Sequence, residues 1–366
     1  MTSRERVLAA LAHRRSDRAP ANYSAHQEVT DRLLARLGLR DYEELLRFFR
    51  VDLRRVSLDY TVPNTGPDAD GYLRNMWGLR TNPSKPDGDP TKVICPFNED
   101  TTVNDVYAHT WPSPDAIDYS GVHAQCERYA RDYATFGAPW SPFFHEVGWL
   151  IGQETFFVWM HTKPDVATAI VDCVVSFEVE VTRRFLDACA RKLDIAYFGN
   201  DFGSQRSLVI SPEQWQRFMR QPLKRFYDIA HDYGCKVMQH SCGAVRDIIP
   251  WLIEDGVDIL DPVQVRAAGM DLACLVRDFG DRLCFHGGVD TQRTLPFGTP
   301  AEVRAEVRSY LDLTRDRGGY ILTSSQNFIA DIPDENIKFH RDVRDTDCPG
   351  SHFPIREILK NAPRAK

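Results

Sequence analysis

The chain has 366 residues, with 45 Lys and Arg against 52 Asp and Glu, which gives a formal net charge of −7. Hydrophobic residues make up 43% of the sequence and charged residues 27%, a composition that excludes a disordered or collagen-like chain. The negative charge, without a run of Lys and Arg, argues against nucleic acid as a partner, and no apolar stretch reaches the ~18 residues of a membrane span.

The first half of the chain predicts three strands and several helices. Short runs of β-branched or aromatic residues suggest strands at residues 19–23, 53–58 and 139–144. Apolar residues at helical spacing predict helices that include residues 33–37, 42–49 and about 164–192.

An insertion interrupts this pattern at residues 60–111. The segment is rich in Pro, Asp, Asn and Gly, and residues 83–90 alone carry three prolines. Such a composition is typical of loops. Residues 71–81 and 92–97 could pair as a small hairpin within it.

The second half alternates strands and helices regularly. Strands are predicted at residues 195–200, 236–240, 257–263, 283–288 and 320–324. Their continuous apolar runs are typical of parallel strands buried on both faces. Ser211-Pro212 and Thr299-Pro300 predict helix starts, Pro222 predicts a kink, and another helix is expected at about residues 245–256.

Eight strand candidates, mostly separated by helices, predict one architecture. Parallel strands with crossover helices form a (β/α)₈ TIM barrel. We therefore expect an α/β fold in which residues 1–366 form a single domain. N-terminal helices and the insertion near residues 60–111 would be additions to the barrel.

Polar residues follow nearly every predicted strand, where the active sites of such barrels lie. They come after the third strand and after five later ones. In chain order they are His145-Glu146, Asn200-Asp201, His240-Ser241-Cys242, Asp261-Pro262 with Gln264, His286 to Asp290, and Ser324 to Asn327.

The sharpest of these motifs is His240-Ser241-Cys242. Residues two apart at a strand end point to the same side, so this imidazole and this thiol face one space. Histidine nitrogen and cysteine sulfur are ligands that Zn²⁺ prefers. A zinc site needs further ligands, and Glu146, Asp201, His286 or Ser324 could supply one. The alternative interpretation is a buried histidine and a small packed cysteine beside Gly243.

Several other polar residues are candidates for the chemistry. Asp201 and Glu146 could supply a metal ligand or transfer a proton, and Asp290 and Gln205 could orient substrate. Each acid could equally cap a helix or turn. The further candidates for substrate contacts are Gln264, His145, Asn327 and His286. Tryptophans that could line a pocket or fill the core are Trp77, Trp111, Trp140, Trp149 and Trp159.

These motifs, taken in order, resemble the uroporphyrinogen decarboxylase (URO-D) superfamily, which includes corrinoid-linked methyltransferases. The resemblance is strongest from residue 194 to residue 337 and extends to Arg4–Val7 and Asp17–Pro20 near the start. The matching segments are Gly199–Gln205, Ile210–Glu213, His240–Gly243, Gly256–Gln264, Gly287–Asp290, Gly318–Leu322 and Asp331–Asn336.

Two departures decide which branch of the superfamily the chain resembles more closely. True decarboxylases carry an Arg-Gln-Ala-Gly-Arg loop after the first strand, and this chain has Ala21 to His26 there, without arginine. The methyltransferase branch binds zinc through an HxC pair, matched by His240 and Cys242, and through a later Cys. Residues 323–325 read Thr-Ser-Ser at that later position, so the resemblance implies zinc held with an oxygen ligand such as Glu146, or no zinc.

The resemblance implies an enzyme that moves a methyl group from a small methylated substrate, such as an aryl methyl ether or a methylamine. The acceptor would be a corrinoid on a partner protein or a thiol, with zinc held by His240 and Cys242. A metal-independent decarboxylase of a small carboxylate, in which Asp201 stabilises the intermediate, is the second hypothesis, and a non-catalytic binding barrel is the third. A homodimer is usual in this superfamily.

The cysteines and the first residues bear on cellular location. Nine cysteines are scattered along the chain without a CxxC pair, which is typical of reduced thiols. Residues 1–15 mix charged side chains with alanine and leucine and lack the apolar run of a signal peptide. We therefore expect a cytoplasmic protein.

Overall fold

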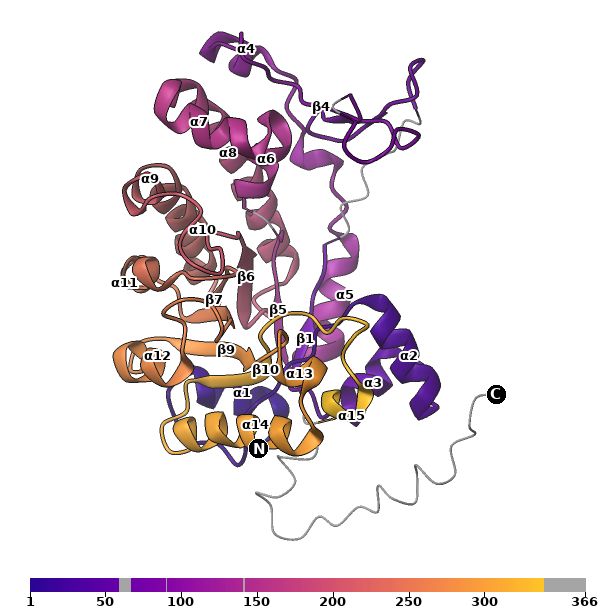
Figure 1. The fold of residues 1–366 in the computed structure, drawn as a ribbon, viewed down its shortest axis with the longest axis vertical. Helices are drawn as coiled ribbons and strands as arrows, with labels where there is room; N and C mark the ends of the chain where they lie inside the picture. The colour runs from indigo at the N-terminus through magenta and orange to yellow at the C-terminus, as the bar shows by residue number, and fades with distance from the viewer. Residues whose placement is uncertain (59–66, 90, 141, 339–366) are drawn as a thin grey trace.

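Seven parallel strands form the central sheet of the protein (Figure 1). The computed structural model describes residues 1–58, 67–89, 91–140 and 142–338. Neighbouring strands pair in chain order. The strands are β1 (Leu53–Arg55), β5 (Ala134–Gly137), β6 (Ile195–Gly199), β7 (Lys236–His240), β8 (Ile259–Val263), β9 (Cys284–Val289) and β10 (Tyr320–Ser324).

Helices connect these strands, and several of them cover the outer face of the curled sheet. The N-terminal helices are α1 (Ser3–Leu11), α2 (Gln27–Leu37) and α3 (Tyr42–Phe48). The middle of the chain contributes α4 (Val103–Ala108), α5 (Ser120–Tyr129), α6 (Phe144–Ile151), α7 (Gln153–Thr162) and α8 (Pro164–Ala188). The remaining helices are α9 (Pro212–Trp215), α10 (Gln221–Asp232), α11 (Ile249–Glu254), α12 (Leu272–Phe279), α13 (Thr294–Phe297), α14 (Pro300–Thr314) and α15 (Asp334–Ile337). Among the described residues, no helix is both long enough and apolar enough to cross a membrane.

A layer of apolar side chains fills the inside of the curled sheet. Each of the seven strands contributes to it, and Val7 and Leu11 of α1 pack against it from below. The strand residues of this layer are Leu53, Ala134, Phe136, Ile195, Met238, Ile259, Cys284 and Ile321. Because this interior is packed with side chains, the sheet has a solid floor beneath its carboxyl-terminal edge.

The predicted helix signals are confirmed in detail. The Ser211 hydroxyl accepts from the Gln214 backbone N–H at the start of α9, and Thr299 and Glu302 form a reciprocal capping box at α14. A π-helical turn, Gln216–Arg220, lies just before Pro222, where we predicted a kink. Proline has no N–H for the carbonyl of residue 218, which explains a wider turn at this point.

Two strand predictions were wrong in position or extent. The third strand is β5, residues 134–137. Of the predicted residues 139–144, residue 141 lies outside the described residues, Pro139, Trp140, Pro142 and Phe143 lie in a loop, and Phe144 begins α6. This strand, Ala-Thr-Phe-Gly, is short and ends in a glycine, because a Cβ atom on Gly137 would lie 2.1 Å from the Val56 carbonyl oxygen, so its apolar run is too short to mark a strand. Residues 19–23, predicted as the first strand, make one parallel bridge, between Ala21 and Leu322. Pro20 lacks the N–H that a longer ladder would need.

Two helix predictions also needed correction. The long helix predicted to reach residue 192 ends earlier, because α8 stops at Ala188 and Ala190 adopts a positive φ of 50°. The helix predicted over residues 245–256 is a 3₁₀ turn, Arg246–Ile248, followed by the short α11. Pro250 in the first turn of α11 fits this break, since proline is accepted at a helix start.

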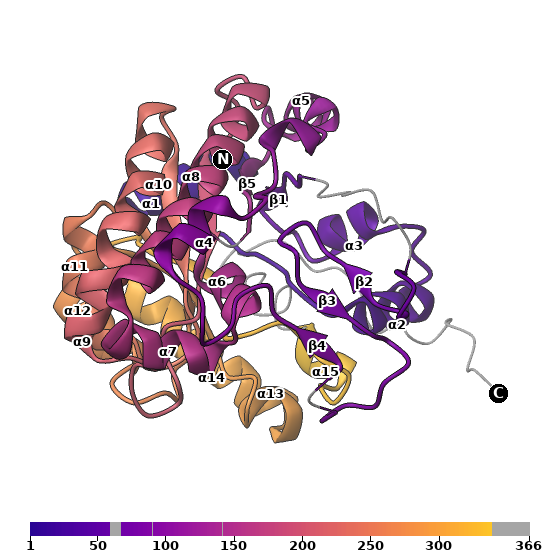
Figure 2. The same ribbon diagram turned by 90° about the horizontal axis from the view of Figure 1, so that it is seen from above.

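The predicted hairpin insertion is a three-stranded antiparallel sheet. Its strands are β2 (Leu73–Arg74), β3 (Arg80–Thr81) and β4 (Val93–Ile94), paired in the order β2-β3-β4. The backbone N–H of Phe97 donates to the Leu150 carbonyl of α6, and Figures 1 and 2 place the insertion at the same end of the molecule as α4, α6 and α7. Residues 60–66 and 90 of the predicted insertion lie outside the described residues.

Candidate active site

A polar layer lies directly above the apolar floor of the curled sheet. Inward-facing strand residues repeat every two positions, so Ile195 is followed by Tyr197, Met238 by His240, and Ile259 by Asp261. The side chains of this layer surround a cavity of about 540 Å³, a usual size for a small-molecule site. Its charged, histidine and cysteine lining residues are Arg55, Asp201, His240, Cys242, Asp261 and His286.

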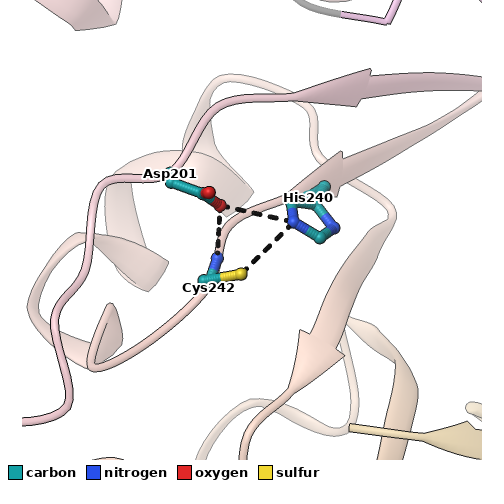
Figure 3. Close-up of side chains that lie close together, drawn as sticks. All are labelled: Asp201, His240 and Cys242. Atoms are coloured by element: carbon teal, nitrogen blue, oxygen red, sulfur yellow. Dashed lines mark hydrogen bonds and ion pairs between the residues drawn. The ribbon is translucent and has the colours of Figure 1, made fainter. Parts of the chain in front are cut away.

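Three of these side chains bring their polar atoms together at one side of the cavity (Figure 3). His240 Nε2 lies 3.3 Å from Asp201 Oδ1 and 3.5 Å from Cys242 Sγ. All three donor atoms lie within 4.8 Å of one another. Asp201 comes from the loop after β6, His240 from the end of β7, and Cys242 from the loop that follows it, as the strand-end prediction required.

Close backbone contact holds these two loops in place. A Cβ atom on Gly203 would lie 2.6 Å from the Cys242 carbonyl oxygen, and one on Gly243 would lie 2.4 Å from Gly203. Gly243 also has a φ of +83°, which side chains rarely adopt. The Cys242 backbone N–H donates to Asp201 Oδ1 over 3.0 Å. The two glycines therefore set the spacing between the carboxylate and the thiol.

Asp261 fixes the orientation of the His240 ring. Asp261 Oδ2 lies 2.7 Å from His240 Nδ1 and accepts the Tyr197 hydroxyl over 2.6 Å, and its other oxygen contacts His286 Nδ1. All of these groups except part of Tyr197 are buried. With its Nδ1–H directed at Asp261, His240 turns Nε2 toward Asp201 and Cys242, an arrangement typical of metal-binding histidines.

The electrostatics of the cluster favour a positive charge at its centre. Burial lowers the pKa of His240, but hydrogen bonds to Asp201 and Asp261 outweigh burial and raise it well above its usual value. Burial likewise raises the pKa of Asp261, and the contacts with His286 and His240 reverse this and hold it below the usual range. Two carboxylates that stabilise a proton on His240 would equally stabilise a metal cation beside it.

The donor set fits a zinc ion. One imidazole nitrogen, one thiol sulfur and one carboxylate oxygen are all common zinc ligands, with bonds of about 2.0–2.3 Å. In a tetrahedron with such bonds, nitrogen and oxygen are about 3.3 Å apart, and nitrogen and sulfur about 3.6 Å apart. The observed separations from His240 Nε2, 3.3 Å to Asp201 and 3.5 Å to Cys242, match these edges.

Trp140 forms a wall beside the cluster. Its ring lies 5.0 Å from the His240 ring and 5.0 Å from the Tyr197 ring, centroid to centroid. A Cβ atom on Gly199 would lie 2.6 Å from the Trp140 ring, so glycine at the end of β6 makes this packing possible. The indole thus shields one side of His240 from water.

Gln326, in the loop after β10, contacts the thiol. Its side-chain Nε2 donates to Cys242 Sγ over 3.1 Å, while its Oε1 accepts the Asn327 backbone N–H over 3.0 Å. The second contact fixes the amide so that an N–H group faces the sulfur. Gln326 thus comes from the region where the resemblance places a third cysteine ligand, and it supplies a hydrogen-bond donor instead.

Four of the five predicted substrate-contacting residues divide into two groups. His286 and Asn327 line the cavity. Gln205 and Gln264 lie behind it, where Gln205 Nε2 donates to Gln264 Oε1 and the same oxygen accepts the Gly243 backbone N–H over 2.9 Å. The two glutamines therefore support the loop that carries Cys242.

The other predicted site residues, the substrate-contact candidate His145 and the catalytic candidates Glu146 and Asp290, lie farther from the cluster. His145 and Glu146 are in the first turn of α6 rather than at a strand end; His145 Nε2 is 4.0 Å from Asp201 Oδ2, and Asp201, not Glu146, completes the cluster. Asp290 is buried beneath the turn after β9, where it pairs with Arg266 over 2.6 Å and caps the Gln292 backbone N–H. That placement corresponds to the loop-cap interpretation of Asp290.

Five residues that line the cavity or organise its polar layer were not among the predicted site residues. They are Asn22, Arg55, Tyr197, Asp261 and Gln326. Asp261 and Gln326 stand in the predicted strand-end motifs, and Tyr197 lies on β6, four residues before Asp201. Applying the two-residue period backwards from each strand end would have found Tyr197.

Comparison with known proteins identifies the family to which the chain is similar. The family profile described as uroporphyrinogen decarboxylase (URO-D) matches residues 132–346. A methylated-thiol–coenzyme M methyltransferase from Methanosarcina mazei is 24% identical in an alignment of 321 residues that covers 84% of this chain and 80% of that protein.

Among solved structures, a methyltransferase from Methanosarcina mazei has a similar fold. The TM-score is 0.64 at 17% sequence identity, and the match covers 94% of this chain and 99% of the other. The family match spans more than half of the chain and includes the strands that carry Asp201, His240, Cys242 and Asp261. The chain belongs to the uroporphyrinogen decarboxylase (URO-D) family.

Proposed function

We propose that this protein is a methyltransferase that uses a zinc ion held by Asp201, His240 and Cys242. The observation that carries this proposal is the convergence of three metal-ligating atoms on one side of a small-molecule cavity. The similarity to methyltransferases, at low sequence identity, supports the same reaction type.

The reaction would transfer a methyl group between a small methylated donor and a thiol or a corrinoid. The acceptor forms a bond to the methyl carbon as the bond between that carbon and the donor atom breaks, and the released donor atom takes up the proton that a thiol acceptor loses. A zinc ion bound here would acidify an acceptor thiol, since the thiolate is the reactive form.

The residues of this chain would prepare the site for that transfer. Asp261 holds the Nδ1–H of His240, so Nε2 stays directed at the cluster. Gln326 stabilises charge on the Cys242 sulfur through its N–H group, and Trp140 limits the access of water to His240. His286 and Asn327 line the remaining space, in which an aryl methyl ether, a methylamine or a methylated thiol would bind.

We also propose that residues 20–22 close the curled sheet into a full barrel within a single domain. Asn22 N donates to the Leu322 carbonyl and Asp52 N donates to the Ala21 carbonyl, each over 2.9 Å. The segment therefore bonds to β10 on one side and to the residue before β1 on the other. Asn22 Nδ2 lies 3.1 Å from His286 Nε2 at the rim of the cavity.

An assay of methyl transfer tests the proposed function. The full chain, with one equivalent of zinc, is incubated with each donor class and with either a small thiol or a reduced free corrinoid as acceptor. We expect a methylated acceptor with at least one donor, and at least 100-fold less product from Cys242→Ala. Without methyl transfer in any combination, the proposal fails.

A decarboxylase acting without metal is the second candidate, and Arg55 is the observation that favours it, because a guanidinium in the cavity could hold a carboxylate. Release of carbon dioxide from a small carboxylate by zinc-free protein, unchanged in Cys242→Ala, would establish this alternative. Ligand binding without any turnover would instead favour a binding protein.

A further inference from the structure

We propose that Gln326 sets the metal preference of the cluster of Asp201, His240 and Cys242, because its N–H group weakens the Cys242 sulfur as a ligand for soft cations. The inference rests on the proposed function for the presence of a metal. It goes beyond that function by naming a residue that selects zinc without binding it. Gln326 is thus a positioning residue, and its effect is measured on metal binding itself.

The side chain of Gln326 is held at both ends of its amide. Nε2 donates to Cys242 Sγ over 3.1 Å, and Oε1 accepts the Asn327 backbone N–H over 3.0 Å. A reversed amide would set its NH₂ group against the Asn327 N–H, where neither group can accept, so one orientation is favoured. The N–H group of Gln326 therefore points at the sulfur before any metal binds.

The loop that carries Gln326 is anchored to the N-terminal segment. The Phe328 backbone N–H donates to the Ser24 carbonyl over 3.0 Å, and the His26 backbone N–H donates to the Phe328 carbonyl over 2.9 Å. The Ser324 hydroxyl donates to the Gln326 carbonyl over 2.6 Å. Because these contacts hold the backbone on both sides of Gln326, the fold rather than a metal sets the distance between its amide and the sulfur.

The Cys242 sulfur is shared between this donor and the candidate metal site. Sγ lies 3.5 Å from His240 Nε2, and the Cys242 backbone N–H is bonded to Asp201 Oδ1 over 3.0 Å. A metal held by the three ligand atoms would bind the same sulfur to which Gln326 donates. The sulfur would then divide its electron pairs between the metal and the N–H group.

A hydrogen bond on a metal-bound thiolate reduces the electron density that the sulfur gives to the metal. The loss is largest for soft cations, whose bonds to sulfur are the most covalent, and smaller for cations that also bind oxygen and nitrogen well. Asp201 supplies a hard oxygen and His240 an intermediate nitrogen, so Cys242 is the one soft ligand of this cluster. A single N–H group on its sulfur therefore shifts the cluster toward zinc and away from cadmium.

Competition between two metals tests this inference without relying on turnover. The metal-free full chain is titrated with Zn²⁺ and with Cd²⁺ against a chromophoric chelator, and the ratio of the two affinities is compared between wild type and Gln326→Leu. Leucine is similar in size to glutamine but has no side-chain N–H group. We expect the ratio in Gln326→Leu to move toward cadmium by about 3–10-fold, the usual effect of one hydrogen bond.

The ratio of affinities separates metal selection from a purely structural role. If Gln326 only supported its loop, Gln326→Leu would weaken the binding of both metals by the same factor. The cobalt-loaded protein gives a second reading, because the sulfur-to-cobalt charge-transfer band should move to lower energy once no N–H group stabilises the sulfur electrons. Gln221→Leu, an exposed substitution at the start of α10, is the matched control and should keep the wild-type ratio and band.

The outcomes separate this inference from the proposed function. A ratio that moves toward cadmium in Gln326→Leu, in a protein that transfers no methyl group, supports the inference and rejects the function. An unchanged ratio, an unmoved cobalt band or a wild type that binds neither metal overturns the inference even if methyl transfer is found. Circular dichroism checks that each variant is folded. Gln326→Asn, whose shorter side chain withdraws the N–H group from the sulfur, replaces Gln326→Leu if that variant is not.

Discussion

Asp261 is the residue on which the organisation of the candidate site depends most. Its carboxylate contacts His240, His286 and the Tyr197 hydroxyl, although it is itself almost fully buried. A buried carboxylate with three partners is costly to form and costly to disrupt. Its place beside Nδ1 of His240 means that a change at Asp261 would alter metal binding without removing a ligand.

Replacing Asp261 by Asn should therefore weaken metal binding while leaving the three ligands in place. We expect the affinity for zinc to fall about 10–100-fold, the usual effect of removing the acceptor behind a metal-binding histidine. Competition with a chromophoric chelator measures the change, and Asp228→Asn on the surface of α10 is the matched control. Equal affinities in Asp261→Asn and the control would show that Asp261 does not support the cluster.

For single residues, the sequence predicted the candidate metal ligands better than the residues that position them. The two-residue spacing of His240 and Cys242, and the position of Asp201 after a strand, follow from the strand period alone. That Asp201 rather than Glu146 approaches them depends on the contact of Gly203 with Gly243, which joins two loops about 40 residues apart. The contact of Gln326 was equally hard to predict, since no local pattern marks a side chain that reaches a sulfur in the loop after another strand.

The loops after β6 and β7 behave as one unit because their backbones touch. Gly203 has no room for a methyl group, since a Cβ atom there would lie 2.6 Å from the Cys242 carbonyl oxygen. The position of Asp201 relative to Cys242 is thus set by the closest approach of these two loops. Any side chain at residue 203 would have to push them apart.

We therefore expect Gly203→Ala to destabilise the fold by about 1–3 kcal/mol and to reduce zinc affinity at least tenfold. Chemical denaturation and chelator competition measure the two effects. The control is Gly121→Ala in α5, where the added methyl meets no close neighbour and should be neutral or slightly stabilising. If Gly203→Ala kept full zinc affinity, the loop contact would not position the ligands.

Strand positions were predicted correctly where the strands are long and apolar, and incorrectly where tertiary packing rather than composition determines which residues form the strand. β7 and β10 begin and end at the predicted residues. β5 was misplaced because its apolar run is short and ends in glycine, and the aromatic residues that resemble a strand, Trp140, Phe143 and Phe144, lie in the loop and the helix beside the site. The segment around Ala21 has the composition of a strand but forms a single bridge, since Pro20 limits its pairing.

For the whole molecule, an ion-pair network under the sheet joins the N-terminal segment to β1. Asp52 is fully buried and accepts from Arg6, Arg18 and the Ala21 backbone N–H. Arg6 also forms a paired contact with Asp17. Because α1 packs against the apolar floor, this network holds the floor on which the cavity stands.

The Arg6–Asp17 contact predicts a pH dependence of stability. Burial raises the pKa of Asp17, but the hydrogen bond and charge of Arg6 outweigh it and lower this pKa to about 2, against 3.8 unperturbed. A carboxyl group whose pKa is lowered by folding stabilises the folded state at pH values above its pKa in the unfolded chain. This contribution is lost as the pH falls from about 4 toward 2.

Asp17→Asn should accordingly cost about 1 kcal/mol at pH 7, because the carboxylate is partly exposed, and the cost should shrink below pH 4. Urea unfolding of wild type and variant at pH 7, 4 and 3 gives this difference directly. Asp316→Asn, in an exposed pair, should differ little from wild type at every pH. A difference that grew on acidification would have the wrong sign for this contact.

The metal content of the protein tests the central claim most directly. The full chain is stripped with a chelator, loaded with zinc and dialysed, and the bound zinc is measured by atomic emission. Wild type is compared with Asp201→Asn, Cys242→Ala and a control, Cys274→Ala, which changes a partly exposed thiol outside the cavity. We predict one zinc per chain in wild type and Cys274→Ala, and loss of retained zinc in Cys242→Ala and Asp201→Asn. Wild-type protein that retains no zinc, or Cys242→Ala that retains as much as wild type, would contradict the proposed metal site.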